Sequence, residues 1–162
     1  MCSRFYSQEA ANAFWAAATM SVNDPRIVSG LTRACVDLVK DFNGHDAANT
    51  IWAAAKLSIS DTNDINSLTQ ACIKCASQFN FHEASNSIWA VAVLGYSDLH
   101  NVSVLARACI NQIKNLKPHE ASNALWAIAK VGLKEDNIVK DLVRVCVDRA
   151  EKCSSMNAVH SL

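Results

Sequence analysis

Residues 121–132 read ASNALWAIAKVG, and weaker copies of this stretch occur three times earlier in the chain. Each copy is centred on a tryptophan, and these tryptophans lie 37 residues apart, at Trp15, Trp52, Trp89 and Trp126. An asparagine three residues before, a leucine sixteen residues after and a cysteine twenty residues after the tryptophan keep the same spacing. A fixed period of this length is typical of an array of structural repeats. We therefore expect four copies of one unit.

Each unit carries the signals of two helices. In the last unit, Pro118 can open a helix, where a missing N–H costs nothing, and Gly132 is a typical residue just after a helix end. A second helix is expected from about Ile138 to Lys152, where apolar residues follow the spacing of one buried face. Alanines crowd the first helix and allow neighbouring helices to approach closely. The sequence predicts an all-α fold, a right-handed α-solenoid of about four 37-residue helix-turn-helix repeats stabilised by their neighbours.

The same period predicts the boundaries of the units. Phe5 stands ten residues before a tryptophan, as Phe42 and Phe79 do, so the first residues resemble the tail of an earlier unit. Leu162 falls one residue before the next tryptophan is due, and we expect the chain to be a fragment of a longer protein. The expected segments are a tail at 1–6, repeats at 7–43, 44–80, 81–117 and 118–154, and the start of a fifth repeat at 155–162.

Composition narrows the class of protein. Half of the residues are apolar, and only four Gly and two Pro interrupt them, which suits helices joined by short connections. Fifteen basic residues balance fifteen acidic ones, so the net charge gives no argument for nucleic acid or for an acidic membrane surface. No apolar run is long enough to span a bilayer, and Glu9 and Asn12 interrupt any secretory signal. We expect no membrane partner.

The stretch NALWAIAKVG at residues 123–132 resembles the Asn-x-Leu-Trp-Ala-x-Ala-Lys-Leu-Gly core of the octotricopeptide and heptatricopeptide repeat proteins. The 37-residue period is similar to the heptatricopeptide version, and the resemblance covers essentially the whole chain. The chain departs from this core at two positions. Thr19 and Val93 stand where the core has lysine, and Ser21 and Ser58 stand where it has glycine. The resemblance implies a helical solenoid that binds RNA in mitochondria or plastids. It also implies a role in transcript processing, stability, translation or ribosome structure.

The tryptophans have two interpretations. Tryptophan is a good stacking platform for an unpaired base. However, each tryptophan is followed by alanine and lies among apolar neighbours such as Leu125 and Ala129. We favour the interpretation that each indole fills the seam between adjacent hairpins.

Polar residues follow the tryptophans along one helical face. At 100° per residue, the positions seven before, three before and four after the tryptophan share its face. An imidazole, an amide and a cation beside an aromatic ring suit the base edges and phosphates of single-stranded RNA. The alternative is that the asparagines bond to the backbone of the next hairpin, and their sameness in every unit favours it. The RNA-binding candidates on this face are Asn12, His45, Asn49, Lys56, His82, Asn86, His119, Asn123 and Lys130.

The position after each asparagine varies between units, as a base-reading position should. It is occupied by Ala13, Thr50, Ser87 and Ala124. These varying positions are the better candidates for distinguishing one nucleotide from another, and Thr50 and Ser87 are added to the RNA-binding candidates.

Arginines recur on the expected second helices, eighteen residues after the tryptophan. Arg33, Arg107 and Arg144 are therefore candidates for a track of phosphate contacts. The alternative, that they belong to an ordinary solvated face, is slightly favoured.

The histidines and cysteines do not predict a metal or disulfide site. Equivalent residues of stacked hairpins lie about 10 Å apart, too far to share a zinc ion or form a disulfide. The seven cysteines are expected to be small buried hydrophobes in a reducing compartment, including Cys72 and Cys75 of the single C-x-x-C.

No catalytic motif stands apart from the repeat, and we expect a binding protein without enzymatic activity, cofactor or small-molecule substrate. The leading hypothesis is that it binds single-stranded or ribosomal RNA, together with other proteins of a ribonucleoprotein assembly. The alternative is a protein–protein interaction scaffold of the armadillo or tetratricopeptide type.

Overall fold

The computed structural model describes residues 6–115 and 117–159, with side chains described through residue 148. This part of the chain contains α-helices, two short 3-10 helices and no strand, so the prediction of an all-α chain is confirmed. The elements in order are α1 (Ser7–Thr19), α2 (Pro25–Asp37), η1 (Val39–Asp41), α3 (Gly44–Lys56), α4 (Thr62–Cys75), η2 (Ala76–Gln78), α5 (Phe81–Val93), α6 (Leu99–Asn111), α7 (Pro118–Val131) and α8 (Asp136–Val159).

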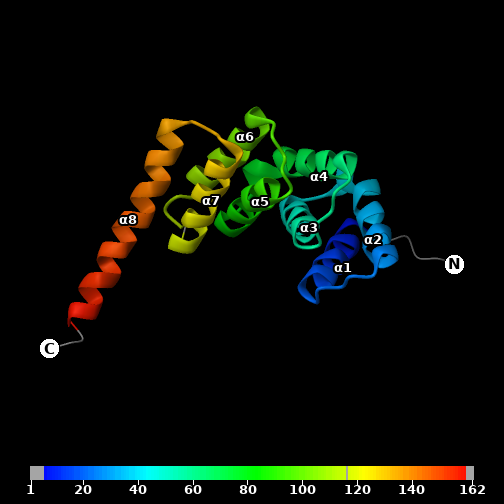
Figure 1. Cartoon of the computed structure of the whole chain (residues 1–162), viewed down its shortest axis with the longest axis horizontal. Coiled ribbons are helices and arrows are strands. Elements are labelled where there is room, and N and C mark those ends of the chain that lie inside the picture. Colours follow the sequence, from blue (N-terminus) through cyan, green and yellow to red (C-terminus); the bar gives the residue numbers. More distant parts are fainter. Residues whose placement is uncertain (1–5, 116, 160–162) are drawn as a thin grey trace.

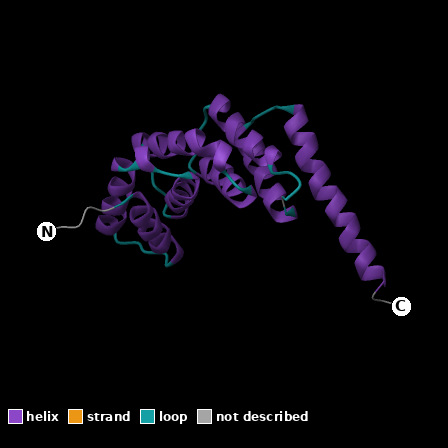
Figure 2. Ribbon diagram, turned by 180° about the vertical axis from the view of Figure 1, so that it is seen from behind, coloured by secondary structure: helices purple, strands orange, loops and turns teal. Residues whose placement is uncertain are grey.

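The helices lie in two layers, which Figures 1 and 2 show from opposite sides. Each odd-numbered helix packs against the next odd-numbered helix, and each even-numbered helix returns alongside the odd-numbered helix before it. We call the pairs α1–α2, α3–α4, α5–α6 and α7–α8 hairpins 1 to 4. The odd-numbered helices pack much more closely together than the even-numbered ones do. The row is therefore bent, with the odd-numbered helices on its inner side (Figure 1).

Recurrent capping residues set the helix starts. Asp24, Asp61 and Asp98 cap α2, α4 and α6, each accepting a backbone N–H two residues ahead at 2.9–3.0 Å. In the odd-numbered helices an acid three residues after the cap accepts the backbone N–H of the cap residue, and in α3 and α5 the side chains of Asn43 and Asn80 also cap the helix. The Glu83 carboxylate, for example, accepts the backbone N–H of Asn80 at 2.9 Å. These acids recur at Glu9, Asp46, Glu83 and Glu120.

Left-handed residues end the odd-numbered helices. Gly132 has a φ of 75° at the end of α7, which confirms it as the predicted stop signal. Gly95 has a φ of 74° at the equivalent place, whereas Ser21 and Ser58 adopt φ of 55° and 56° there. Two serines therefore occupy a conformation that favours glycine.

We expect Ser58→Gly to raise the free energy of unfolding by about 0.5–1 kcal/mol, because glycine relieves the left-handed strain but gains freedom in the unfolded chain. Gly95→Ser at the equivalent place should lower the free energy of unfolding. Urea unfolding followed by circular dichroism measures both. A loss of stability in Ser58→Gly together with a gain in Gly95→Ser would contradict the strain argument.

In the first three hairpins the residue before the tryptophan is buried more deeply in the core than the tryptophan. Phe14, Ile51 and Ile88 are 0% exposed, among alanines that let the helices approach closely. Trp15 and Trp126 are instead 43% and 46% exposed, and Trp52 and Trp89 are half-buried. The expectation that the indoles fill the seams is therefore confirmed only in part: Trp52 and Trp89 pack against the core, whereas Trp15 and Trp126 remain accessible. Alanine-rich helices leave room for a phenyl or branched aliphatic side chain. The tryptophan that follows this residue points 100° away around the helix axis.

Four cysteines confirm their expected role as buried hydrophobes, while Cys2 and the side chain of Cys153 lie outside the described part of the chain. Cys35, Cys72, Cys75 and Cys109 are buried free thiols, and Cys146 is half-buried. Burial raises the pKa of the Cys35 and Cys109 thiols to about 12, and it also raises the pKa of Cys72 and Cys75. The C-x-x-C thiols donate weak hydrogen bonds to the backbone carbonyls of Ala47 and Phe42. Neutral thiols in this setting are poor nucleophiles.

The two ends of the chain differ from the sequence expectation. Helix α8 was expected to end near Lys152, but it continues without a break to Val159. Residues 155–159 thus extend α8 instead of starting a new unit, because no turn separates them from it. The rest of the proposed fifth repeat, 160–162, and residues 1–5 of the proposed tail lie outside the described residues.

Candidate nucleic-acid interface

One stripe of each odd-numbered helix remains accessible on the inner side of the bend. In α3 the accessible residues are His45, Asn49, Trp52 and Lys56, and every other residue of that helix is buried. We call this stripe and its equivalents on α1, α5 and α7 the inner stripe. It contains Asn12, Trp15, His45, Asn49, Trp52, Lys56, His82, Asn86, Trp89, His119, Asn123, Trp126 and Lys130. The prediction that these positions share one helical face is confirmed by their exposure.

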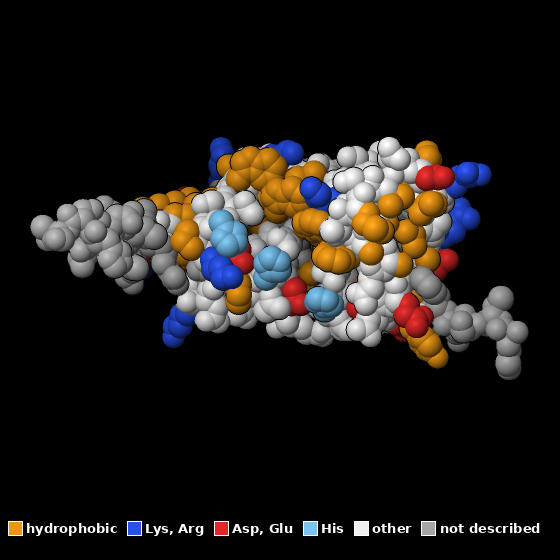
Figure 3. Space-filling model, turned by 90° about the horizontal axis from the view of Figure 1, so that it is seen from below, with side chains coloured by type: hydrophobic (Ala, Val, Ile, Leu, Met, Phe, Trp, Pro, Cys, Tyr) orange, Lys and Arg blue, Asp and Glu red, His pale blue; other side chains and the backbone are white. Residues whose placement is uncertain are grey.

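Histidines on the inner stripe contact the next hairpin. His45 Nδ1 lies 3.2 Å from Glu83 Oε1, and His82 Nδ1 lies 3.2 Å from Glu120 Oε1. Figure 3 shows the row of imidazoles across this face, with acidic and apolar side chains beside it. The imidazoles of His45 and His82 thus each link two adjacent hairpins.

Two stripe asparagines bond to these histidines. Asn49 Nδ2 lies 3.0 Å from His45 Nε2, and Asn86 Nδ2 lies 3.1 Å from His82 Nε2. These two asparagines therefore bond to histidines, and not to the backbone of the next hairpin as the alternative supposed. Asn12 and Asn123 are exposed on the outer hairpins.

The aromatic rings of the inner stripe lie beside one another and beside cations. The ring centroids of Trp15 and Trp52 are 6.4 Å apart, with planes tilted by 32°. Lys56 Nζ lies 5.8 Å from the Trp52 ring centroid, and Lys130 Nζ lies 4.9 Å from that of Trp126. Half-accessible indoles with a nearby ammonium group can stack a base and contact its phosphate.

Thr50 and Ser87 do not belong to this surface. Both are 0% exposed, so the prediction that they discriminate between bases was wrong. The position after the asparagine faces the even-numbered helix of the preceding hairpin, where Thr50 lies beside the Cys35 thiol and Ser87 beside that of Cys72.

The arginine candidates lie in the other layer. Arg33, Arg107 and Arg144 are exposed on α2, α6 and α8, and the structure does not bring them together with the inner stripe. Arg107 Nη2 forms an ion pair with Glu135 Oε2 at 2.6 Å. This pairing agrees with the solvated-face interpretation.

A family model described as the RNA-editing substrate-binding complex 6 protein matches residues 2–159. The chain belongs to this family. No curated protein matches the sequence. Membership in the RNA-editing substrate-binding complex 6 family supports the RNA-related function expected from the sequence, but it does not identify the chain as an octotricopeptide or heptatricopeptide repeat protein.

Sequence reasoning missed the carboxylates that contact the histidines of this family member. Glu83 and Glu120 each directly follow a histidine at the start of an odd-numbered helix, and no role in a contact between hairpins was predicted for them. The available signal was the 38-residue offset between each histidine and the acid of the next unit.

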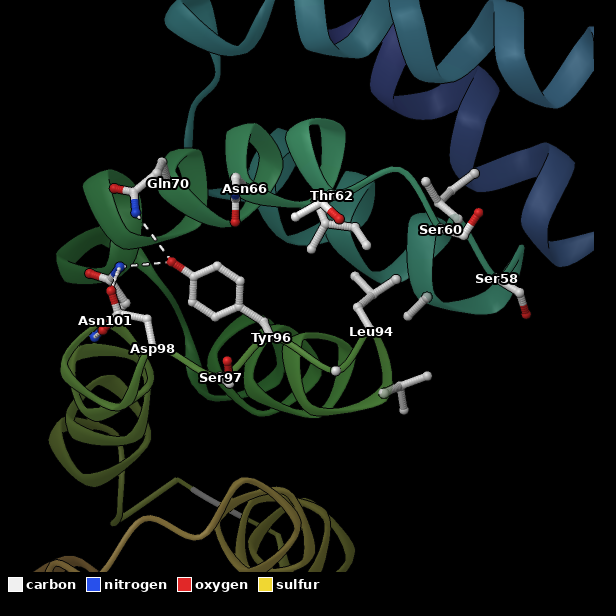
Figure 4. A pocket seen from close by; sticks show the side chains of 15 residues that line it. Ser58, Ser60, Thr62, Asn66, Gln70, Leu94, Tyr96, Ser97, Asp98 and Asn101 are labelled. Atoms are coloured by element: carbon white, nitrogen blue, oxygen red, sulfur yellow. Dashed lines mark hydrogen bonds between the residues drawn. The ribbon is translucent and has the colours of Figure 1, made fainter.

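A polar groove between hairpins 2 and 3 was also missed. It has a volume of about 780 Å³ and lies between the loop after α3 and the loop after α5. Tyr96 projects into it, and its hydroxyl accepts hydrogen bonds from Asn101 Nδ2 at 2.8 Å and Gln70 Nε2 at 3.4 Å (Figure 4). Tyr96 occurs in one unit only, so the periodicity carried no signal for it.

The described helices include none with the length and apolar character needed to cross a membrane.

Proposed function

We propose that the inner stripe binds single-stranded RNA and that the protein holds an RNA substrate within an RNA-editing assembly. The observation that carries this proposal is the recurrence of indole, amide, imidazole and ammonium groups on one accessible face of consecutive helices. Membership in the RNA-editing substrate-binding complex 6 family supports it. We assign the protein a binding role without a catalytic step.

Unpaired RNA fits this surface better than a duplex does. Splayed bases can stack on the Trp15 and Trp52 rings and present their edges to Asn49. A duplex presents mainly phosphates and 2′-hydroxyls, and the cations beside the stripe tryptophans are the two lysines Lys56 and Lys130. Because the net charge is zero, we expect binding to rest on stacking more than on charge.

The finer description also belongs to the proposal. We infer that the hairpins form a right-handed α-solenoid of four 37-residue repeats, of the octotricopeptide or heptatricopeptide type that the core stretch resembles. That resemblance supports a location in mitochondria or plastids. It also supports ribosomal RNA as a second class of RNA partner.

A protein–protein scaffold is the second candidate function. It is favoured by the neutral charge and by apolar side chains left accessible on α8, where Val143 and Val147 are 43% and 48% exposed. A scaffold of this kind would bind a partner helix, with or without RNA present.

We expect a fluorescent 12-nucleotide single-stranded RNA to bind with a Kd on the order of 1–100 µM, measured by fluorescence anisotropy. With two lysines contacting phosphates, the logarithm of the binding constant should fall against log salt with a slope of about −1.4. A duplex of the same length should bind more weakly. Failure of every single-stranded oligonucleotide to bind at low salt would overturn the proposal and leave the scaffold.

A further inference from the structure

We propose that Asn49 and Asn86 contact base edges, and that Glu83 and Glu120 are positioning residues that orient these amides from the following hairpin through His45 and His82. This inference rests on the proposed RNA-binding function. It makes base recognition by one hairpin depend on the docking of the next.

The contacts form the same three-residue chain at two joints. At the first, Glu83 of α5 lies 3.2 Å from His45 Nδ1, and His45 Nε2 lies 3.0 Å from Asn49 Nδ2. At the second, the corresponding distances from Glu120 through His82 to Asn86 are 3.2 and 3.1 Å. Agreement between two independent joints indicates a built arrangement.

Proton counting fixes the direction of each hydrogen bond. A carboxylate only accepts, so His45 Nδ1 must carry the proton that faces Glu83. In the neutral ring Nε2 then has a lone pair and accepts from the Asn49 amide. The amide keeps its carbonyl Oδ1 and one N–H for a ligand. Without the carboxylate, the imidazole could take either tautomer and the amide could turn over.

Each positioning carboxylate is itself held at the start of its helix. Glu83 Oε2 accepts the Asn80 backbone N–H at 2.9 Å, and Glu120 Oε2 accepts that of Lys117 at 2.9 Å. The other oxygen of each carboxylate is the one that faces the histidine. Glu120 is 2% exposed, so water competes little for it. The imidazole therefore has a fixed acceptor only while the next hairpin is docked.

The outer hairpins lack this arrangement in the described residues. Hairpin 1 has Gln8 at the histidine position, and Asp46 of α3 instead contacts the Ser7 hydroxyl at 3.4 Å. His119 of hairpin 4 lies 3.7 Å from Glu120 of its own helix. Asn49 and Asn86 should therefore discriminate between bases, whereas Asn12 and Asn123 should not.

An oriented amide offers a donor and an acceptor side by side, which pair with a base edge that carries the complementary groups. An amide that can rotate by 180° can pair with either order of donor and acceptor on a base edge, so it discriminates less between bases. Loss of the orienting carboxylate should therefore lower base preference more than it lowers overall affinity.

The test compares Glu83→Ala with Glu9→Ala. Both remove the acid of a capping box, because Glu9 Oε2 accepts the Tyr6 backbone N–H at 3.0 Å, but among the residues that the structure describes Glu9 contacts no histidine. Nitrogen-15 NMR of the imidazoles should show His45 as the Nδ1–H tautomer in the unmodified protein and in Glu9→Ala. In Glu83→Ala this dominance should be lost. Anisotropy with 12-nucleotide A, C, G and U homopolymers should show a preference that falls about tenfold in Glu83→Ala and in Asn49→Leu.

The outcomes separate the two levels of the proposal. If no homopolymer binds the unmodified protein, the proposed function fails and the base-contacting role of the asparagines fails with it. If RNA binds but Glu83→Ala keeps both the His45 tautomer and the base preference, the RNA-binding function stands and this inference is overturned. An equal loss of preference in Glu9→Ala would also overturn it, since a capping effect alone would then explain the result.

Discussion

Replacing Ile88 by alanine should lower the free energy of unfolding by about 2–5 kcal/mol. Ile88 is 0% exposed on α5, which packs against both α3 and α7. Removing three carbon atoms there leaves a cavity that neighbouring alanines are too small to fill. Because stacked hairpins are stabilised mainly by their neighbours, the loss weakens the joints on both sides of α5. Urea unfolding followed by circular dichroism measures the change.

Trp126→Ala is the control for this prediction. It removes a larger side chain, but Trp126 is 46% exposed, so its removal should cost less than the loss of Ile88. If Trp126→Ala destabilised the protein more than Ile88→Ala, the tryptophans would carry more of the core stability than the residues before them, and our assignment of the core would be wrong.

The period predicted the helices and the inner stripe correctly because both depend on geometry within one helix. A rotation of 100° per residue places His45, Asn49, Trp52 and Lys56 on one face whatever the neighbours do, and this face is accessible. It could not show which residue is buried most deeply. Apolar neighbours surround both Ile51 and Trp52, and the choice between them depends on how closely two alanine-rich helices approach.

Contacts between hairpins were harder to predict for the same reason. Equal spacing shows that His45 and His82 occupy equivalent places. It does not predict how far one helix is shifted along its axis relative to the next. This axial shift places His45 beside Glu83, which lies thirty-eight residues later in the sequence. The prediction for Thr50 was wrong for a different reason. A small polar residue at a position that varies between units can be buried beside a thiol as well as exposed for base recognition.

The double variant Trp15→Leu/Trp52→Leu should weaken binding of single-stranded RNA by at least about 30-fold, equivalent to about 2 kcal/mol. The two ring centroids lie 6.4 Å apart, and Lys56 Nζ lies 5.8 Å from that of Trp52, so the variant removes the whole stacking surface beside Lys56 and leaves its charge in place. Leucine keeps apolar contacts where Trp52 is half-buried, but it offers no flat face to a base. Anisotropy titration at constant salt measures the loss, and circular dichroism checks that the helices remain.

Arg144→Ala is the matched surface control, since Arg144 is exposed on α8 in the other layer. It removes a full positive charge, whereas the double tryptophan variant removes none. If binding rests on the inner stripe, the uncharged change should have the large effect and the charge change almost none. Should Arg144→Ala weaken binding more than the tryptophan variant does, RNA would follow the even-numbered helices. The inner stripe would then be left for a partner of another kind.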